Sequence, residues 1–132
     1  MTEDELQAAV TGMCDDLNPP APWIHIGDSR RVEAGGPWRQ GFPDLLIIGQ
    51  HRMLVRELKG DGGQLHARQN VWLTWLCQAG VDADLWTPAD LENGTIARQL
   101  AELNQPWPDQ APDTPDEARL RELYRPRIPD QE

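Results

Sequence analysis

The sequence predicts a single α/β domain whose helices and strands follow the order αβββαβα, with a proline-rich appendage at the end. Three observations predict this class. Some segments repeat apolar residues at helical spacing, and two short apolar runs flank a tight turn, as in a β-hairpin. The length of 132 residues suits one modest hydrophobic core, and no apolar run approaches the ~20 residues that a membrane span needs.

The first element expected is an amphipathic helix over residues 2–17. Thr2 is placed to cap this helix, with Glu5 as the capping-box partner three residues later. One face carries Leu6, Val10, Met13 and Leu17. The prolines between residues 18 and 22 end the helix. Because the first residues are acidic, we expect neither a secretory signal nor a transit peptide, and therefore a cytoplasmic protein.

Three strands are expected next. Residues 23–26 form a short strand, and a long glycine-containing loop follows over 27–42. The apolar runs 43–48 and 53–59 are too short for helices and flank a turn at 49–52. These two runs therefore predict the antiparallel hairpin.

The second half of the domain alternates again. A helix is expected over residues 65–79, followed by a short strand at 82–86 and a helix at 88–103. The apolar stripe of the first of these helices comprises Leu65, Trp72, Leu76 and Ala79, with Val71 and Trp75 beside it. We expect Trp72, Trp75 and Trp86 to belong to the core.

The chain divides into a domain of residues 1–104 and a region of residues 105–132, which holds a proline-rich linker, a short helix at 115–124 and a tail. Two cysteines, Cys14 and Cys77, are too few for a disulfide framework or a four-cysteine zinc site. We interpret both as small buried apolar residues in a reducing compartment.

Charge is unevenly distributed along the chain. The net charge of −10 argues at first against a nucleic-acid partner. However, residues 30–81 hold seven bases and four acids, whereas residues 1–29 hold six acids and no base. Residues 82–132 hold twelve acids and five arginines. An acidic ligand would therefore meet the middle of the chain, which also contains Lys59, the one lysine beside eleven arginines.

Charged residues gather where the two hairpin strands meet the rest of the domain. With the turn centred on Gln50 and His51, Asp44 lies opposite Glu57, with Cβ atoms roughly 5 Å apart. Lys59 is two residues beyond Glu57 and so points to the same face of the sheet.

Two carboxylates at this separation stay ionised only with a positive charge between them. A hard divalent cation such as Mg²⁺ suits that position, and the backbone carbonyl of Leu58 offers a further oxygen. Lys59 would orient or deprotonate a water there, or neutralise charge on a phosphate. The set favours phosphodiester hydrolysis. The alternative is a salt-bridged strand end, in which Glu57 pairs with Arg56 or Lys59 and Asp44 caps a turn.

The sequence lacks the motifs that other kinds of active site need. The sequence has no Ser-His-Asp arrangement, no Cys/His cluster and no G-x-x-x-x-G-K motif, so we expect no nucleotide cofactor. His25, His51 and His66 show no metal-ligand spacing and are interpreted as structural or exposed.

A longer series of motifs resembles a known family. Gly41-Phe42-Pro43-Asp44-Leu45, then Glu57-Leu58-Lys59, then Gln69 before Val71-Trp72-Leu73, is similar to the PD-(D/E)xK nuclease superfamily, and within it to the VRR-NUC group. The resemblance covers residues 3–103. It implies a restriction-endonuclease-like αβββαβ core, with a mixed central sheet flanked by helices. It also implies an Mg²⁺- or Mn²⁺-dependent endonuclease acting as a homodimer on branched DNA, in repair or phage DNA processing. A phage-encoded protein would work in the host cytoplasm.

The resemblance also assigns roles. Asp44 and Glu57 match the metal-binding carboxylates, Lys59 matches the lysine of the motif, and Gln69 matches a glutamine on the following helix. Glu3 resembles an N-terminal glutamate that approaches the metal; the alternative is a solvated acid near a helix end. Gln69 also lies seven residues before Leu76, on the stripe expected to face the sheet, where a polar amide needs a partner.

Arginines before and after the hairpin are candidate DNA contacts. Arg30, Arg31 and Arg39 lie in the preceding loop, next to Asp28 and Ser29, and Arg68 begins the following helix. Arginine suits phosphate binding, whereas a solvent-facing role is the alternative. Two loop tryptophans, Trp38 and Trp107, are candidates for contacts with DNA or a second subunit. A non-catalytic nuclease-fold module and an acidic interaction protein remain the rival functions.

Overall fold

The computed structural model describes residues 1–26, 36 and 38–105. Its elements are α1 (Glu3–Asp16), β1 (Trp23–His25), β2 (Leu45–Ile48), β3 (Met53–Leu58), α2 (Ala67–Gln78), β4 (Asp82–Trp86), α3 (Pro88–Glu92) and α4 (Thr95–Glu102). The strands form one sheet in the order β1-β2-β3-β4, antiparallel except for the parallel pair β3–β4. The predicted α/β fold with a mixed sheet is therefore confirmed.

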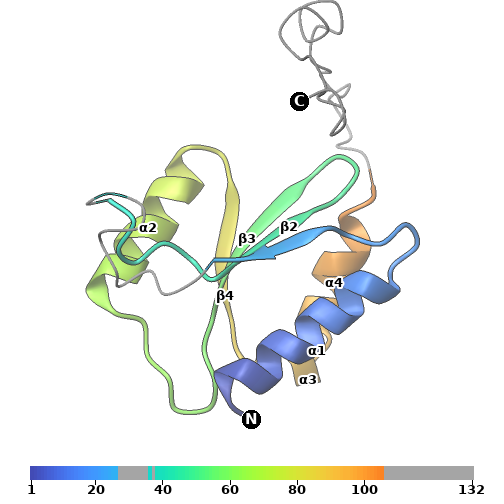
Figure 1. The fold of residues 1–132 in the computed structure, drawn as a ribbon, viewed down its shortest axis with the longest axis horizontal. Helices are drawn as coiled ribbons and strands as arrows, with labels where there is room; N and C mark the ends of the chain where they lie inside the picture. The colour runs from blue at the N-terminus through green and yellow to red at the C-terminus, as the bar shows by residue number, and fades with distance from the viewer. Residues whose placement is uncertain (27–35, 37, 106–132) are drawn as a thin grey trace, which may run out of the picture.

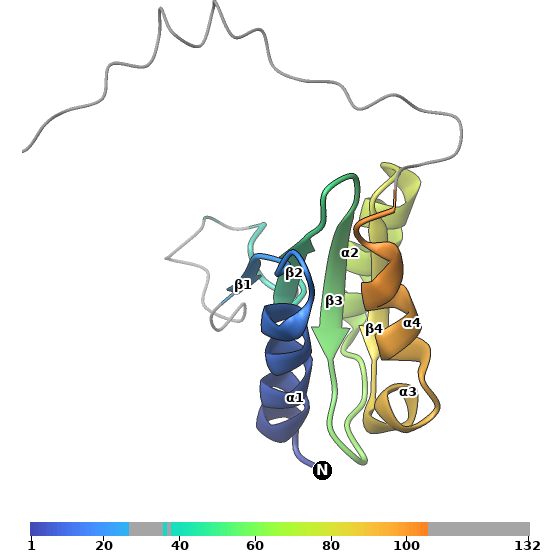
Figure 2. The same ribbon diagram turned by 90° about the vertical axis from the view of Figure 1, so that its right-hand side faces the viewer.

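Helices cover the sheet on both sides. Figure 1 shows α2 on one side of the strands and α1, α3 and α4 on the other, and Figure 2 shows the same arrangement from the side. The crossover from β3 to the parallel β4 runs through α2, as parallel strands require. The sheet thus separates two hydrophobic clusters.

The hairpin has the predicted register. Ile47 pairs with Leu54 and Leu45 pairs with Arg56. Leu45 and Ile47 belong to the cluster under α1 and α4, whereas Leu46 packs with the smaller cluster under α2. Because strand residues alternate between faces, this register fixes which face Asp44 and Glu57 occupy.

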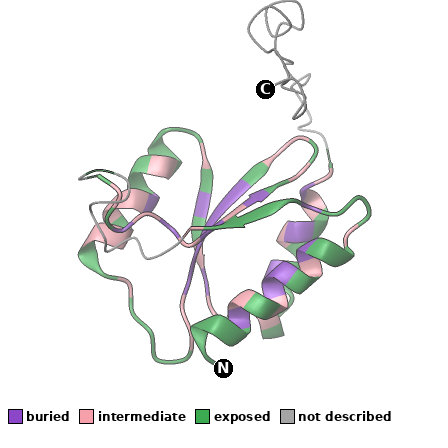
Figure 3. Cartoon of the chain, viewed as in Figure 1, coloured by how far each residue is buried: buried purple, intermediate pink, exposed green. Residues whose placement is uncertain are grey.

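Helix α1 begins as predicted. The Thr2 hydroxyl accepts a hydrogen bond from the Glu5 amide, and the Glu5 carboxylate accepts one from the Thr2 amide. Leu6 and Val10 are buried, together with Cys14, and Figure 3 shows this buried stripe on the inner side of the helix. The predicted burial of Cys14 is confirmed.

Two sequence-based expectations about the later helices are wrong. The single helix expected over 88–103 is two helices, α3 and α4, because Gly94 adopts a left-handed conformation (φ 85°) that glycine accommodates without strain. In α2 the buried residue is Leu73, while Ala79, Cys77 and Trp75 are exposed.

The reason for the second difference is the hydrogen bonding of Trp72. Its indole N–H donates to the carbonyls of Trp38 and Gln40, which lie beside α2 rather than on the sheet. This contact turns the helix so that Gln69, Leu73 and Leu76 face the strands. Trp86, by contrast, is buried as expected.

The described part of the core extends to the end of α4. The two hydrophobic clusters draw on residues 6–103, and Leu103 is the last buried residue among those that the structure describes. Apart from Gln105, the region 105–132 with its expected linker, helix and tail lies outside the described residues. Among the described residues, no helix is both long enough and apolar enough to cross a membrane.

Candidate metal centre

Asp44 and Glu57 meet at one end of the hairpin, as the register predicts. Glu57 lies near the end of β3 and is 1% exposed. Asp44 lies one residue before β2, and its carboxylate accepts a 3.0 Å hydrogen bond from the Leu58 amide. The Asp44 carbonyl also accepts from the Ile26 amide at 2.6 Å. These two bonds tie Asp44 to β3 and to the residue after β1.

Glu3 joins them from α1. One carboxylate oxygen from each of Glu3, Asp44 and Glu57 lies within 4.8 Å of the others. The start of α1 reaches the site because Gly60 permits a close approach. A Cβ at Gly60 would lie 2.6 Å from the Glu3 nitrogen. In addition, the Asp61 amide donates to the Met1 carbonyl at 3.0 Å.

The electrostatics of this acidic cluster are unfavourable without a cation. Burial, and secondly the Asp44 carboxylate, raise the pKa of Glu57 to about 8. The same two causes raise the pKa of Glu3. Moreover, Glu57 Oε1 is buried and has no hydrogen-bond partner among the described residues. A buried carboxylate oxygen without a partner is costly, and a divalent cation would satisfy it. The donor set therefore fits Mg²⁺ or Mn²⁺.

Lys59 and Gln69 both contact the other oxygen of Glu57. Lys59 Nζ lies 3.4 Å from Glu57 Oε2, and Gln69 Nε2 donates to the same oxygen at 3.1 Å. The Gln69 carbonyl oxygen accepts from the His66 amide at 2.9 Å, which fixes the orientation of the Gln69 amide group. The predicted polar partner of Gln69 is thus Glu57.

The alternative of a salt-bridged strand end is partly present. Glu57 pairs with Lys59, but Arg56 points to the opposite face, as strand alternation requires. Arg56 is buried, donates to Asp82 and Gln99, and lies 4.9 Å from the centre of the Trp86 ring. Sequence reasoning missed this buried arginine, although the alternation alone separates it from Glu57.

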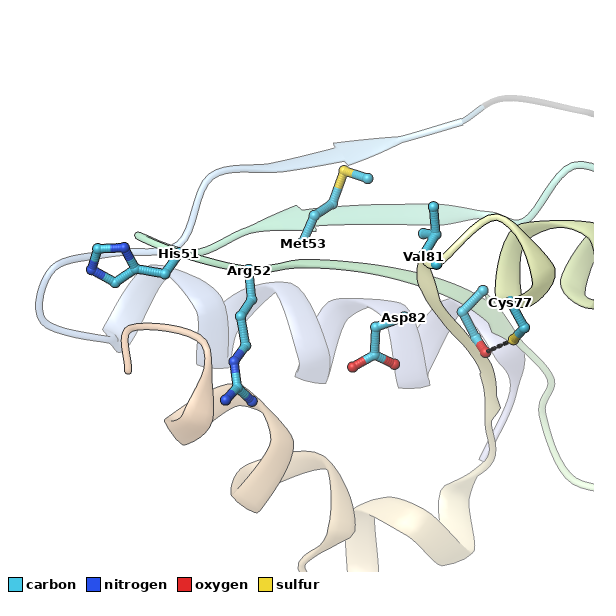
Figure 4. Close-up of a pocket in the computed structure, with 8 residues that line it drawn as sticks. His51, Arg52, Met53, Cys77, Val81 and Asp82 are labelled. Carbon is cyan, nitrogen blue, oxygen red and sulfur yellow. Dashed lines mark hydrogen bonds between the residues drawn. The ribbon is translucent and has the colours of Figure 1, made fainter. Parts of the chain in front are cut away.

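The site opens onto a groove. A cavity of about 580 Å³ is lined by Glu3, Lys59, His66 and the glycine-rich turn at 60–63. A second cavity, of about 520 Å³, lies at the other end of β3, between the β2–β3 turn and the junction of α2 with β4 (Figure 4). No carboxylate of the cluster lines that second cavity.

The predicted DNA contacts are distributed differently. Arg30, Arg31 and Trp107 lie outside the described residues, as do Asp28 and Ser29. Arg39 is half-buried in the segment before β2. Arg68 lies next to Gln69 at the start of α2, with its guanidinium 5.7 Å from the centre of the Trp38 ring. The three histidines lie outside the acidic cluster. The backbone carbonyl of Leu58 remains a predicted metal ligand.

The chain is thus an α/β domain with a mixed sheet, in which a carboxylate cluster and a lysine lie at the ends of paired strands. A comparison with solved structures identifies the same fold in a "VRR_NUC domain protein", with a TM-score of 0.59 and 22% sequence identity. The match covers 79% of this chain and 91% of that chain. At this identity the similarity is one of fold, and the predicted likeness to the VRR-NUC group is confirmed at that level. No protein-family model and no curated protein matches the chain.

Proposed function

We propose that this protein is a metal-dependent DNA endonuclease that hydrolyses phosphodiester bonds with Mg²⁺ or Mn²⁺ as cofactor. One observation carries the proposal. Three carboxylates converge, one of them the buried Glu57, whose Oε1 has no hydrogen-bond partner among the described residues, and the Lys59 ammonium group lies beside Glu57. This combination suits a phosphate ester, because the cation and the lysine together offset its negative charge.

Asp44, Glu57 and Glu3 would hold the cation, with the Leu58 carbonyl as a further oxygen ligand. When bound, such a cation supplies Lewis-acid chemistry to the phosphate oxygens and to water. The protein contributes a rigid, partly buried cradle in which Asp44 and Glu57 are tied to neighbouring backbone or side-chain groups.

Lys59 and Gln69 act on the reacting groups. Lys59 lies at the edge of the groove, where its ammonium would orient the attacking water and offset charge on the phosphate. Gln69 holds Glu57 and positions water from the α2 side. The water oxygen bonds to phosphorus while one P–O bond breaks, and a proton passes to the leaving oxygen. No covalent bond between protein and DNA is needed.

The substrate and assembly belong to the same proposal. We propose branched or otherwise structured DNA as the substrate, a homodimer as the assembly, and a role in DNA repair or phage DNA processing, as the resemblance of the sequence motifs implies. Arg30, Arg31, Arg39 and Arg68 are the proposed phosphate contacts.

The test is cleavage of labelled DNAs that differ in shape: linear duplex, single strand, flap, splayed arm and four-way junction. We expect cutting only with Mg²⁺ or Mn²⁺, and its loss in Glu57→Gln. Glu3→Gln should weaken binding of Mn²⁺, whereas Asp4→Asn, an exposed acid on the same helical turn, should not.

Three outcomes would contradict the proposal. Cutting that persists in EDTA or in Glu57→Gln would indicate a contaminating nuclease. A folded protein that binds neither Mn²⁺ nor any of the DNAs would favour an acidic interaction protein. Binding of DNA without cleavage would favour the non-catalytic module.

A further inference from the structure

Two tryptophans are exposed on the flank of α2. Trp38 is 61% exposed and Trp75 is 39% exposed, with ring centroids 6.0 Å apart. Trp72 lies behind them, at 5.3 Å from Trp75. We call Trp38, Trp75 and the guanidinium of Arg68 the aromatic platform. Neighbouring aromatic rings that stay exposed to solvent offer a flat surface on which a ligand can bind.

The platform is rigidly supported. Trp72 Nε1 donates to the carbonyls of Trp38 and Gln40, at 2.9 and 3.0 Å. Phe42 packs edge-on against Trp72, with centroids 5.1 Å apart. Gly41 has a φ of 87°, and a Cβ there would lie 2.7 Å from the Arg68 backbone. Residues 38–42 are therefore seated directly on α2, so that Trp38 is held in place before any ligand arrives.

The platform adjoins the acidic cluster. Arg68, Trp72 and Trp75 follow helical spacing and form one stripe of α2. The neighbouring stripe starts with Gln69, which donates to Glu57. A ligand that reaches the metal centre along the start of α2 therefore passes Arg68 and Trp38.

From this arrangement we infer that Trp38 stacks against an unpaired base of the nucleic-acid substrate while Arg68 contacts the adjoining phosphate. The inference rests on the proposed function and narrows its substrate class to DNA with an unpaired nucleotide near the cleaved bond. An indole face beside a guanidinium matches a base and its phosphate, and stacking of this kind is independent of sequence. A base inside a duplex offers no free face, so a blunt duplex offers stacking surfaces only at its two ends.

Binding in EDTA tests the inference without any need for cleavage. The full chain is titrated against a fluorescein-labelled single strand and a blunt duplex of equal length, with anisotropy as the readout. We expect Trp38→Ala to weaken single-strand binding about ten-fold or more, and duplex binding less than about two-fold. Trp38→Phe should retain most of the affinity. Trp23→Ala is the matched control, because Trp23 is 36% exposed on β1 and lies outside the platform.

Three outcomes would overturn the inference: equal losses on both DNAs, no loss in Trp38→Ala, or no binding of single strands by the original chain. Sedimentation of the DNA-free protein provides a fourth outcome that would overturn the inference. If the original protein is a dimer and Trp38→Ala is a monomer, the platform binds a second copy of the chain instead of DNA. Failure of the proposed function can be distinguished from failure of this inference. Trp38-dependent binding without metal-dependent cutting would refute the nuclease alone, whereas cutting indifferent to Trp38→Ala would refute the platform alone.

Discussion

Among the residues that the structure describes, Glu57 is the carboxylic acid whose pKa is raised most by its surroundings. Burial and the Asp44 carboxylate raise its pKa to about 8, against an ordinary value of 4.5. Between these pH values the folded protein holds a proton that the unfolded chain has released. Stability therefore falls as pH rises through this interval, because the unfolded chain binds fewer protons than the folded one.

We accordingly expect the melting temperature in EDTA to fall between about pH 5 and about pH 8, a window set by the raised pKa of Glu57. Glu57→Gln should remove most of this slope and raise the melting temperature at pH 8 by roughly 4 °C or more, since an uncharged isostere avoids the burial cost. Thermal melts over a pH series measure this effect. Asp4→Asn should keep the slope, and a slope of the opposite sign would contradict the assignment.

Lys59 is the residue whose removal should affect cleavage but not folding. Its side chain is 13% exposed and pairs with the more deeply buried Glu57. Lys59→Ala should lower single-turnover cleavage by about 100-fold or more, with a melting temperature close to that of the original protein. Arg98→Ala, an exposed base on α4, is the control. Cleavage that survives in a clean preparation of Lys59→Ala would refute the role of this lysine.

At the scale of the element, α1 is positioned by a glycine on another segment. Gly60 lies against the backbone of Thr2 and Glu3. A Cβ atom added at Gly60 would lie 2.8 Å from the Thr2 carbonyl carbon and 2.6 Å from the Glu3 nitrogen. Gly60→Ala should therefore push α1 away from the end of β3, cost about 1–3 kcal/mol of stability and weaken Mn²⁺ binding. Denaturant melts and a Mn²⁺ titration measure both effects.

A second glycine provides the comparison. Gly12 lies inside α1 with nothing within 4 Å of a Cβ position. Gly12→Ala should stabilise the helix by about 0.5–1 kcal/mol and leave Mn²⁺ affinity unchanged. Equal effects of the two substitutions would mean that the close contact at Gly60 does not position Glu3.

Helix α2 shows where hydrophobic periodicity misleads. Its sequence holds apolar residues on several sides and predicts a buried stripe through Trp72, whereas Leu73 is the buried residue. A polar contact accounts for the difference, because the Trp72 indole N–H needs an acceptor and donates to the carbonyls of Trp38 and Gln40. Gln69 was nevertheless predicted to face the sheet, since it shares a helical stripe with Leu76 in either case.

At the scale of the whole molecule, the described core closes with α4. Ile96, Leu100 and Leu103 are almost completely buried in the larger cluster. A chain ending at Gln105 should therefore fold, with a melting temperature within about 4 °C of the full chain. A chain ending at Glu92 loses all three buried residues, at about 2–5 kcal/mol each, and should not fold. Thermal melts of both chains test the domain boundary, and an unfolded 105-residue chain would move that boundary toward the C-terminus.

Arg56 connects three elements in this assembly. From β3 it donates to Asp82 on β4 and to Gln99 on α4, and Gln99 also accepts from the Trp86 indole. A buried charge of this kind is retained only with nearly complete hydrogen bonding. The local sequence around Arg56 does not predict its hydrogen-bond partners, because they come from later segments of the chain.

The sequence by itself determined the order of the helices and strands, the register of the hairpin, and the common face of Asp44, Glu57 and Lys59. These features depend on strand alternation and turn length, which are local properties of neighbouring residues. Only the tertiary structure decided the rotation of α2, the burial of Arg56, and the approach of Glu3 to the other carboxylates. The approach of Glu3 was implied by family resemblance, but it depends physically on α1 packing against Gly60. Such contacts join segments far apart in the chain, and their geometry follows from packing and hydrogen bonding that no local pattern records.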